Sequence, residues 1–117
     1  MIRRFNENLD NIYFVYCFLD PRKPGNYKFG DITLDHEPIY IGKGKGNRHQ
    51  NHYKLYKTRN TRFYSKIQSI IEKGYEPKFI ILSDNLSEKE SFLQECHFIE
   101  LIGKIENGGP LTNLTDG

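Results

Sequence analysis

The 117-residue sequence contains no tryptophan, one methionine and only two cysteines. Cys17 and Cys96 are too few and too far apart for a disulfide framework, and both have apolar neighbours, so we expect two buried thiols in a reducing compartment. No apolar run approaches the roughly 18 residues of a membrane span, and Arg3-Arg4 is not followed by the apolar core of a signal peptide. We therefore expect a soluble intracellular protein, in the cytoplasm or associated with a nucleoid or nucleus.

Acidic residues are missing from a long internal stretch. Between Glu37 and Glu72 there is no aspartate or glutamate, although the net charge of the chain is only +2 because acidic residues dominate from Asp84 onward. Aromatic side chains interleave with the basic ones there, which is typical of a nucleic-acid-binding face, but a pair of solvated helices explains the composition equally well. The basic residues are Lys43, Lys45, Arg48, Lys54, Lys57, Arg59, Arg62 and Lys66.

The length predicts one domain over residues 1–117, and eight Tyr and eight Phe imply a partly aromatic core. Residues 12–19 are apolar on both alternating faces, which predicts a central strand with Tyr16 on the face of Phe14 and Phe18. We expect the proline-containing residues 20–26 to break this strand. A long excursion as far as Glu37, with a small hairpin over residues 27–34, then leads to an antiparallel strand over 38–42.

The remaining pattern alternates helices with one more strand. A helix is expected from Asn47 to about Lys57, and a second begins after Thr61 as its N-cap and stops at Gly74. Residues 77–82 predict a third strand, and Ser87 opens a capping box for a helix over 88–102. The fold class is therefore mixed α/β (α+β), with a three-stranded, mainly antiparallel sheet flanked by three helices.

The stretch from Pro38 to His52 holds the most informative motif. Glycine and lysine alternate from Gly42 to Gly46, and a turn of this kind between a strand and a helix suits a phosphate, although a merely flexible turn is the plain alternative. The run lacks the ending of a nucleotide-binding loop. On a helix, Arg48 and His52 would share one face, and they combine a guanidinium fork with a proton carrier, although such a pair is often only surface.

Two metal readings compete. His49 and His52 have zinc-like spacing, but the other candidate ligands are scattered, so structural zinc is disfavoured. Glu95 lies in the apolar stripe of the last helix, where a carboxylate is costly unless it is paired or metal-bound. Glu100 occupies the neighbouring face, so periodicity does not choose between the two, and a carboxylate at the rim of the core facing a lysine is an equally good reading.

Tyr40-Ile41-Gly42 resembles the second half of the signature of the GIY-YIG nuclease superfamily. Phe14-Val15-Tyr16 stands where the first half belongs, with the chemically useful tyrosine retained. The Gly-Lys-Gly-x-Gly-x-Arg form that ends at Arg48 resembles the branch of phage homing endonucleases and of animal nucleases with ankyrin and LEM domains. Arg48 with His52 is also similar to some restriction enzymes of the superfamily. The segment between the two half-motifs is longer than in most members, and its role is open.

The resemblance implies a metal-dependent DNA endonuclease. Glu95 would be the sole protein ligand of one Mg²⁺ or Mn²⁺ ion, and Tyr16 or His52 the general base, provided that nearby cations lower the tyrosine pKa. Arg48 would clamp the phosphate, Tyr40 orient it, and Asn113 match the closing asparagine that holds the site together. The nucleic-acid contacts expected are Lys43, Lys45, Lys54, Lys57, Arg59 and Arg62.

Other readings stay open. The same fold could be a non-catalytic module for binding nucleic acid, or a nuclease domain active only with a partner. We expect a monomer that dimerises transiently on DNA and has no membrane partner, and the chain reads as the catalytic piece of a longer protein.

Overall fold

The computed structural model describes residues 12–46 and 60–117. Three antiparallel strands form one sheet in the order β2-β1-β3, as the sequence predicts. Two α-helices flank the sheet within the described residues, whereas the third predicted helix, over residues 47–57, lies outside them. The elements are β1 (Tyr13–Phe29), β2 (Ile32–Lys45), α2 (Thr61–Glu72), β3 (Lys78–Leu86), α3 (Glu88–Ile102) and the 3₁₀ turn η2 (Ile105–Asn107).

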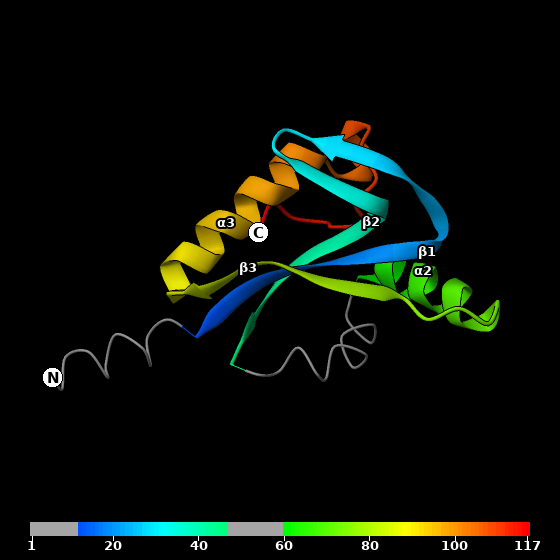
Figure 1. Ribbon diagram of the computed structural model, residues 1–117, viewed down its shortest axis with the longest axis horizontal. Helices are drawn as coiled ribbons and strands as arrows, with labels where there is room; N and C mark the ends of the chain where they lie inside the picture. Colours follow the sequence, from blue (N-terminus) through cyan, green and yellow to red (C-terminus); the bar gives the residue numbers. More distant parts are fainter. Residues whose placement is uncertain (1–11, 47–59) are drawn as a thin grey trace, which may run out of the picture.

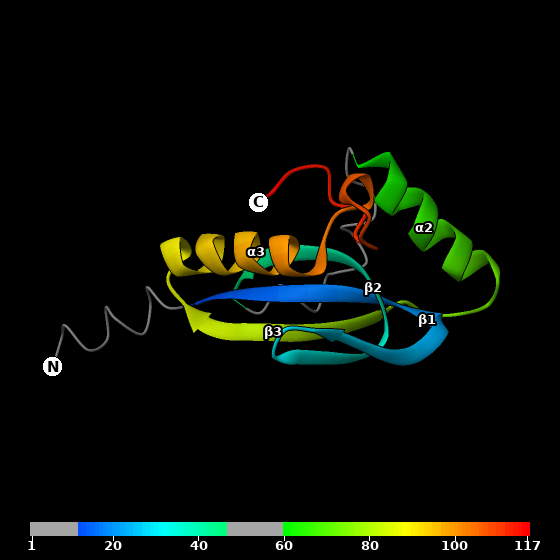
Figure 2. The ribbon, with the colours of Figure 1, turned by 90° about the horizontal axis from the view of Figure 1, so that it is seen from above.

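The central strand β1 divides the core into two clusters. Its residues Val15, Cys17 and Leu19 pack against α3, whereas Phe14, Tyr16 and Phe18 pack against α2. Because successive strand residues point to opposite faces, the two helices cover opposite faces of the sheet. The ribbon shows α3 and α2 well apart, toward opposite ends of β1 (Figure 1). The chain end runs between them (Figure 2). The expected aromatic core is therefore present, mainly on the α2 face.

The expected break after residue 19 is wrong. β1 continues through Pro21 and Pro24 to Phe29, and its pairing with β2 shifts register between Phe18 and Leu19 and on both sides of Pro24. Bulges of this kind accept proline because they need no regular ladder donor there. The small hairpin over residues 27–34 is confirmed, with Phe29 paired to Ile32 and Gly30 at φ 58° in its turn.

The glycine-lysine run is also extended rather than a turn. Gly42 to Lys45 belong to β2, and only Gly46, at φ 64°, takes a turn conformation, with its N–H donating to the Ile12 carbonyl at 2.7 Å. Glycine and lysine disfavour strands intrinsically, but pairing with the aromatic half of β1 outweighs that preference. Any phosphate-facing turn therefore begins at Gly46, and the residues that follow it lie outside the described ones.

The helix ends match expectation with one correction. Asn60, not Thr61, caps α2, with its side-chain oxygen accepting from the Phe63 N–H at 3.0 Å. α3 has the predicted bounds and the predicted capping box of Ser87 and Glu90. Cys17 is buried as expected, but Cys96 is only half-buried. In the described part of the chain, every helix is too short or too polar to cross a bilayer.

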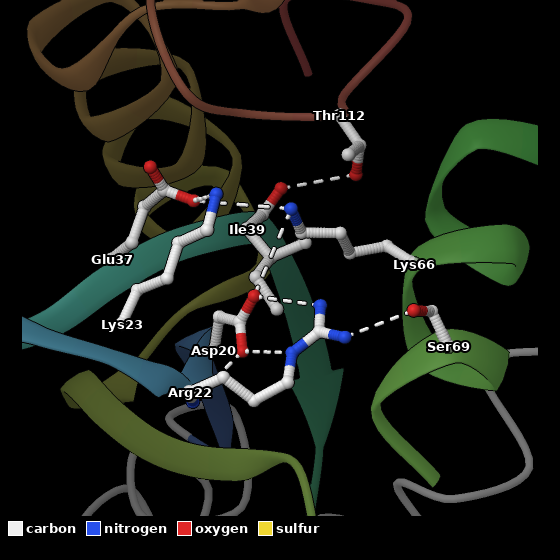
Figure 3. A network of polar contacts seen from close by, with 8 residues as sticks. All are labelled: Asp20, Arg22, Lys23, Glu37, Ile39, Lys66, Ser69 and Thr112. Carbon is white, nitrogen blue, oxygen red and sulfur yellow. Dashed lines mark hydrogen bonds and ion pairs between the residues drawn. The ribbon is translucent and has the colours of Figure 1, made fainter. Parts of the chain in front are cut away.

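A buried ion pair ties the start of the 20–37 segment to α2 (Figure 3). The Asp20 side chain is 0% exposed and accepts hydrogen bonds from Arg22 Nε at 2.9 Å and Nη2 at 3.0 Å. Arg22 Nη1 donates to Ser69 of α2 at 2.9 Å, and Lys66 Nζ of α2 lies 3.7 Å from Asp20 Oδ2. The inserted segment, whose role the sequence left open, thus fixes the position of α2.

Burial raises the pKa of Asp20, but the hydrogen bonds from Arg22 and the charges of Arg22 and Lys66 outweigh it, so the pKa lies below its ordinary value. A carboxyl whose folded-state pKa is depressed stabilises the fold above its unfolded pKa of about 4 and loses that contribution as pH falls through the folded value.

We predict that the unfolding midpoint falls as the pH drops below about 4, the unfolded-state pKa, toward the depressed folded-state pKa of Asp20, and that Asp20→Asn weakens this dependence. At pH 7 the variant should lose about 2 kcal/mol, the usual worth of hydrogen bonds to a charged partner. Urea unfolding against pH measures both effects. Asp31→Asn is the control, since Asp31 is exposed at the hairpin turn between β1 and β2. Equal pH dependence in wild type and Asp20→Asn would contradict the prediction.

Candidate active site at the outer edge of β2

Tyr16 crosses the sheet to reach the neighbouring strand. It is paired with Gly42 of β2, and a Cβ atom added to Gly42 would overlap the Tyr16 hydroxyl and the end of its ring. Gly44 bears the same relation to the ring of Phe14. Phe79 packs against the Tyr16 ring, 5.0 Å between centroids, so only 5% of this tyrosine is exposed. Gly42, the glycine of the second half-motif, therefore leaves the space that the ring of Tyr16 from the first half-motif occupies.

The same pairing of β1 with β2 also places Tyr40, two residues before Gly42. It stands opposite Phe18, and its ring stacks on Phe63 of α2 with 4.3 Å between centroids. The two tyrosines of the half-motifs interact: the charge of Tyr40 contributes to the raised pKa of Tyr16. Antiparallel pairing of β1 with β2 thus brings together two phenols that lie far apart in the sequence.

Glu95 of α3 is within electrostatic reach of both phenols. Burial raises the pKa of Glu95 and the nearby Lys43 partly offsets it. Burial and the Glu95 charge in turn raise the pKa of Tyr16 and of Tyr40. Glu95 is half-buried, whereas Glu100 is exposed. The structure therefore distinguishes the two carboxylates that helical periodicity left equivalent.

Asn113 closes the outer edge of β2. Its Oδ1 accepts from the Ile41 N–H at 3.0 Å, and its Nδ2 donates to the Ile41 carbonyl at 2.8 Å. Ile41 lies between Tyr40 and Gly42, so this asparagine is fastened to the centre of the second half-motif. Only 7% of Asn113 is exposed. Its two bonds fix the backbone of Ile41, and its role in holding the site together stays a prediction.

The expected basic contacts divide into three groups. Lys43 and Lys45 are exposed at the end of β2, where Lys43 lies over the ring of Phe92 and within reach of Glu95. Arg62 is exposed in the first turn of α2. The other five expected site residues lie outside the described residues: Arg48, His52, Lys54, Lys57 and Arg59.

The carboxylate chemistry fits one hard cation. Among residues 12–46 and 60–117 no cluster of three or more histidine, cysteine or carboxylate side chains is present, which leaves Glu95 as a single carboxylate with phenol oxygens nearby. Magnesium accepts this arrangement because it keeps most of its water and takes one or two carboxylates, whereas structural zinc needs four protein ligands. Glu95 could therefore hold a magnesium ion.

The sequence expectation missed two residues that support Asn113. The Asn60 side chain, besides capping α2, donates through Nδ2 to the Thr112 carbonyl at 2.8 Å. Thr112 in turn donates through its N–H and its hydroxyl to the Ile39 carbonyl, at 2.7 and 3.0 Å. An asparagine before a helix is a visible capping signal, but its second bond joins residues 52 positions apart and leaves no local pattern.

These features define the class of the protein. Two half-motifs on paired strands, with Tyr16 lying over the glycine of the other, and a glutamate and an asparagine brought to them from the C-terminal part, are what the GIY-YIG resemblance implied. The model of the LEM-3-like GIY-YIG domain family matches residues 13–117, and the chain belongs to that family. It therefore has a nuclease fold. No curated protein and no solved structure matches the chain significantly.

We predict that Gly42→Ala displaces Tyr16 and costs about 1–3 kcal/mol of folding free energy, as overpacking does. Tyr16→Ala removes the side chain that the new methyl group would meet, so the double variant should lose less than the sum of the two single losses. Urea unfolding of the four proteins measures this coupling. Strictly additive losses would show that the two side chains do not collide.

A second prediction separates the two bonds of Asn60. Asn60→Asp keeps a cap acceptor for the Phe63 N–H but cannot donate to the Thr112 carbonyl, whereas Asn60→Ala loses both. We expect losses of about 1 kcal/mol for Asp and about 2 for Ala, and faster hydrogen exchange at the Ile41 amide in both. An unchanged Ile41 exchange rate in Asn60→Asp would show that Asn60 does not support the hydrogen bond between Asn113 and Ile41.

Proposed function

We propose that this domain is an endonuclease that hydrolyses DNA phosphodiester bonds with one divalent metal ion, magnesium or manganese, held by Glu95. The observation that supports the proposal is that Tyr16 lies over Gly42, two residues from Tyr40 on β2, while Glu95 is near enough for its charge to contribute to the raised pKa of both tyrosines. A half-buried carboxylate within electrostatic reach of two phenols is costly for a merely structural site. It is what a metal-assisted phosphodiesterase needs.

Each residue has a proposed task. The ion, when bound, neutralises charge that develops on the phosphate and on the leaving 3′ oxygen. Tyr40 orients the phosphate or the attacking water, while Arg48 clamps the phosphate oxygens with its guanidinium fork. Asn113 keeps the Tyr40-Gly42 backbone in place through its two bonds to Ile41. Lys43, beside Glu95, supplies positive charge at the carboxylate end of the site.

The identity of the general base has two candidates. Tyr16 is close to the site, but burial, followed by Tyr40 and Glu95, places its pKa far above the usual value. A tyrosine base requires nearby cations to lower its pKa. Within the described residues burial instead dominates and raises the pKa of Tyr16, so Tyr16 keeps its proton at neutral pH. Tyr16 then acts as a hydrogen-bond donor to water or phosphate, and His52, whose ordinary pKa is near neutrality, takes the proton.

We predict that the protein nicks supercoiled plasmid in magnesium and not in excess chelator, and that Glu95→Gln slows nicking by at least about 100-fold, as loss of a metal ligand does. Glu100→Gln is the matched control because it removes the same charge from an exposed position of the same helix. It should nick at the wild-type rate.

The outcomes separate the alternatives. Plasmid binding without nicking would identify a non-catalytic module, and nicking that appears only after a partner is added would identify a partner-activated nuclease. Nicking by Glu95→Gln at the wild-type rate would remove Glu95 from the mechanism, and an equal loss in Glu100→Gln would show that general charge, rather than the site, sets the rate.

A further inference from the structure

A groove with a basic lining lies beside the candidate active site. It has a volume of about 530 Å³, and residues of β1, α2 and the C-terminal tail line it. Three cationic side chains contribute, Arg22, Arg62 and Lys66, together with four serine and threonine residues, and none of the described residues that line it carries a carboxylate. Cations and hydroxyl groups are the side chains that proteins use to contact phosphate.

The groove is linked to the candidate site through one tail residue. Thr112 lines it and is the residue before Asn113, which is bonded to Ile41 in the second half-motif. Both tail residues run along the outer edge of β2, where Thr112 bonds to Ile39. A nucleic-acid strand with one phosphate at the second half-motif would therefore reach the groove along this edge of β2.

Asp20 holds Arg22 and Lys66 in position but leaves some of their N–H groups available to a phosphate. Arg22 uses three of its N–H groups on Asp20 and Ser69, which leaves two of the five that a guanidinium carries, counted among the described residues. Lys66 lies 3.7 Å from Asp20 and 3.9 Å from Glu37, beyond hydrogen-bond length, so its ammonium N–H groups stay available. The buried carboxylate thus lies between both cations and fixes their position (Figure 3).

The groove also has an apolar wall. Ile105 and Pro110 line it opposite the basic residues of α2, and 45% of Ile105 is exposed. A free phosphate ion has no use for such a wall, whereas the deoxyribose between two phosphates can pack on it. The third cation, Arg62, is exposed and has no ion pair within the described part of the chain, which leaves its whole fork free for a backbone phosphate.

We propose that this groove, which we call the Arg22–Arg62–Lys66 groove, binds the phosphate backbone of the DNA strand next to the bond that is cut. The proposal rests on the proposed nuclease function and extends it to substrate positioning. It also gives the 20–37 segment a task, because that segment supplies Arg22 and the Asp20 carboxylate that fixes it. Binding here is independent of base sequence, since only backbone groups are contacted.

The test measures binding of a short fluorescein-labelled DNA duplex in chelator, between about 50 and 200 mM salt, by anisotropy. Arg62→Gln should weaken binding about fivefold and reduce the slope of log K against log salt by about 1, the effect of one lost phosphate contact. Lys73→Gln is the matched control: it removes one positive charge from the opposite end of the same helix, outside the groove. It should keep the wild-type slope.

A second variant guards against an indirect effect of Arg62 on α2. Ser65→Glu places a negative charge in the groove at an exposed position and removes no basic side chain. It should weaken DNA binding at least as much, while the unfolding midpoint stays at the wild-type value, which shows that α2 remains folded. Equal salt slopes for Arg62→Gln and Lys73→Gln, or unchanged binding by Ser65→Glu, would overturn the proposal.

The proposal and the nuclease function fail in different ways. Absence of nicking by the wild type refutes the enzyme, but the anisotropy of Arg62→Gln and Lys73→Gln still decides the groove. Nicking by the wild type, combined with equal binding by the groove variants, keeps the enzyme and removes the groove. A loss that appears only with an RNA duplex of the same length would assign the groove to RNA and overturn its assignment to DNA.

Discussion

The reciprocal hydrogen bonds between the Asn113 side chain and the backbone of Ile41 are the constraint on which the site depends. β2 is an edge strand, and the outward N–H and C=O groups of such a strand are costly when buried and hazardous when exposed. A side-chain amide presents a donor and an acceptor at the spacing of a peptide group. Asn113, with Thr112 on Ile39, therefore satisfies this edge with two residues, without a fourth strand.

Closing the edge of β2 with a side chain determines which groups lie next to the half-motifs. The edge is closed by a side chain and not by another strand within the described residues, and Glu95 of α3 and Lys43 of β2 lie within electrostatic reach of this part of β2. Tyr16 reaches the same edge from the central strand because Gly42 has no side chain to stop it. Strand register, a missing Cβ and an amide side chain together determine the position of the two phenols.

The features that sequence predicts here are those with a local cause. The apolar run of β1 and the capping box at Ser87 are written in neighbouring residues, and both are present. Pro21 and Pro24 were misread as a break because a bulge that tolerates proline depends on how β2 pairs with β1, which no local pattern records. The run from Gly42 to Lys45 was misread as a turn for the same reason: its partner strand decides.

The residues of the candidate site also differ in whether their position has a local or a long-range cause. Family resemblance pointed to Asn113 without giving a reason, and the reason is its pair of bonds to a residue 72 positions earlier. Periodicity could not choose between Glu95 and Glu100, because the choice depends on which face of α3 meets the end of β2. The sequence does not predict the supporting role of Asn60, because its bond to Thr112 forms only once α2 and the tail are in place.

α2 connects the inserted segment to the site through a series of specific bonds. Arg22, held by Asp20, donates to Ser69 in the second half of α2, and Asn60 at its first end donates to Thr112. The helix packs on the sheet mainly through Phe63, Ile67 and Ile70, an apolar stripe that turns this face to the sheet. Polar bonds at both ends add a further constraint, because hydrogen bonds are directional whereas apolar packing is not. The tail that carries Asn113 therefore takes its position from α2, and α2 takes its orientation from the segment that lies between the two half-motifs.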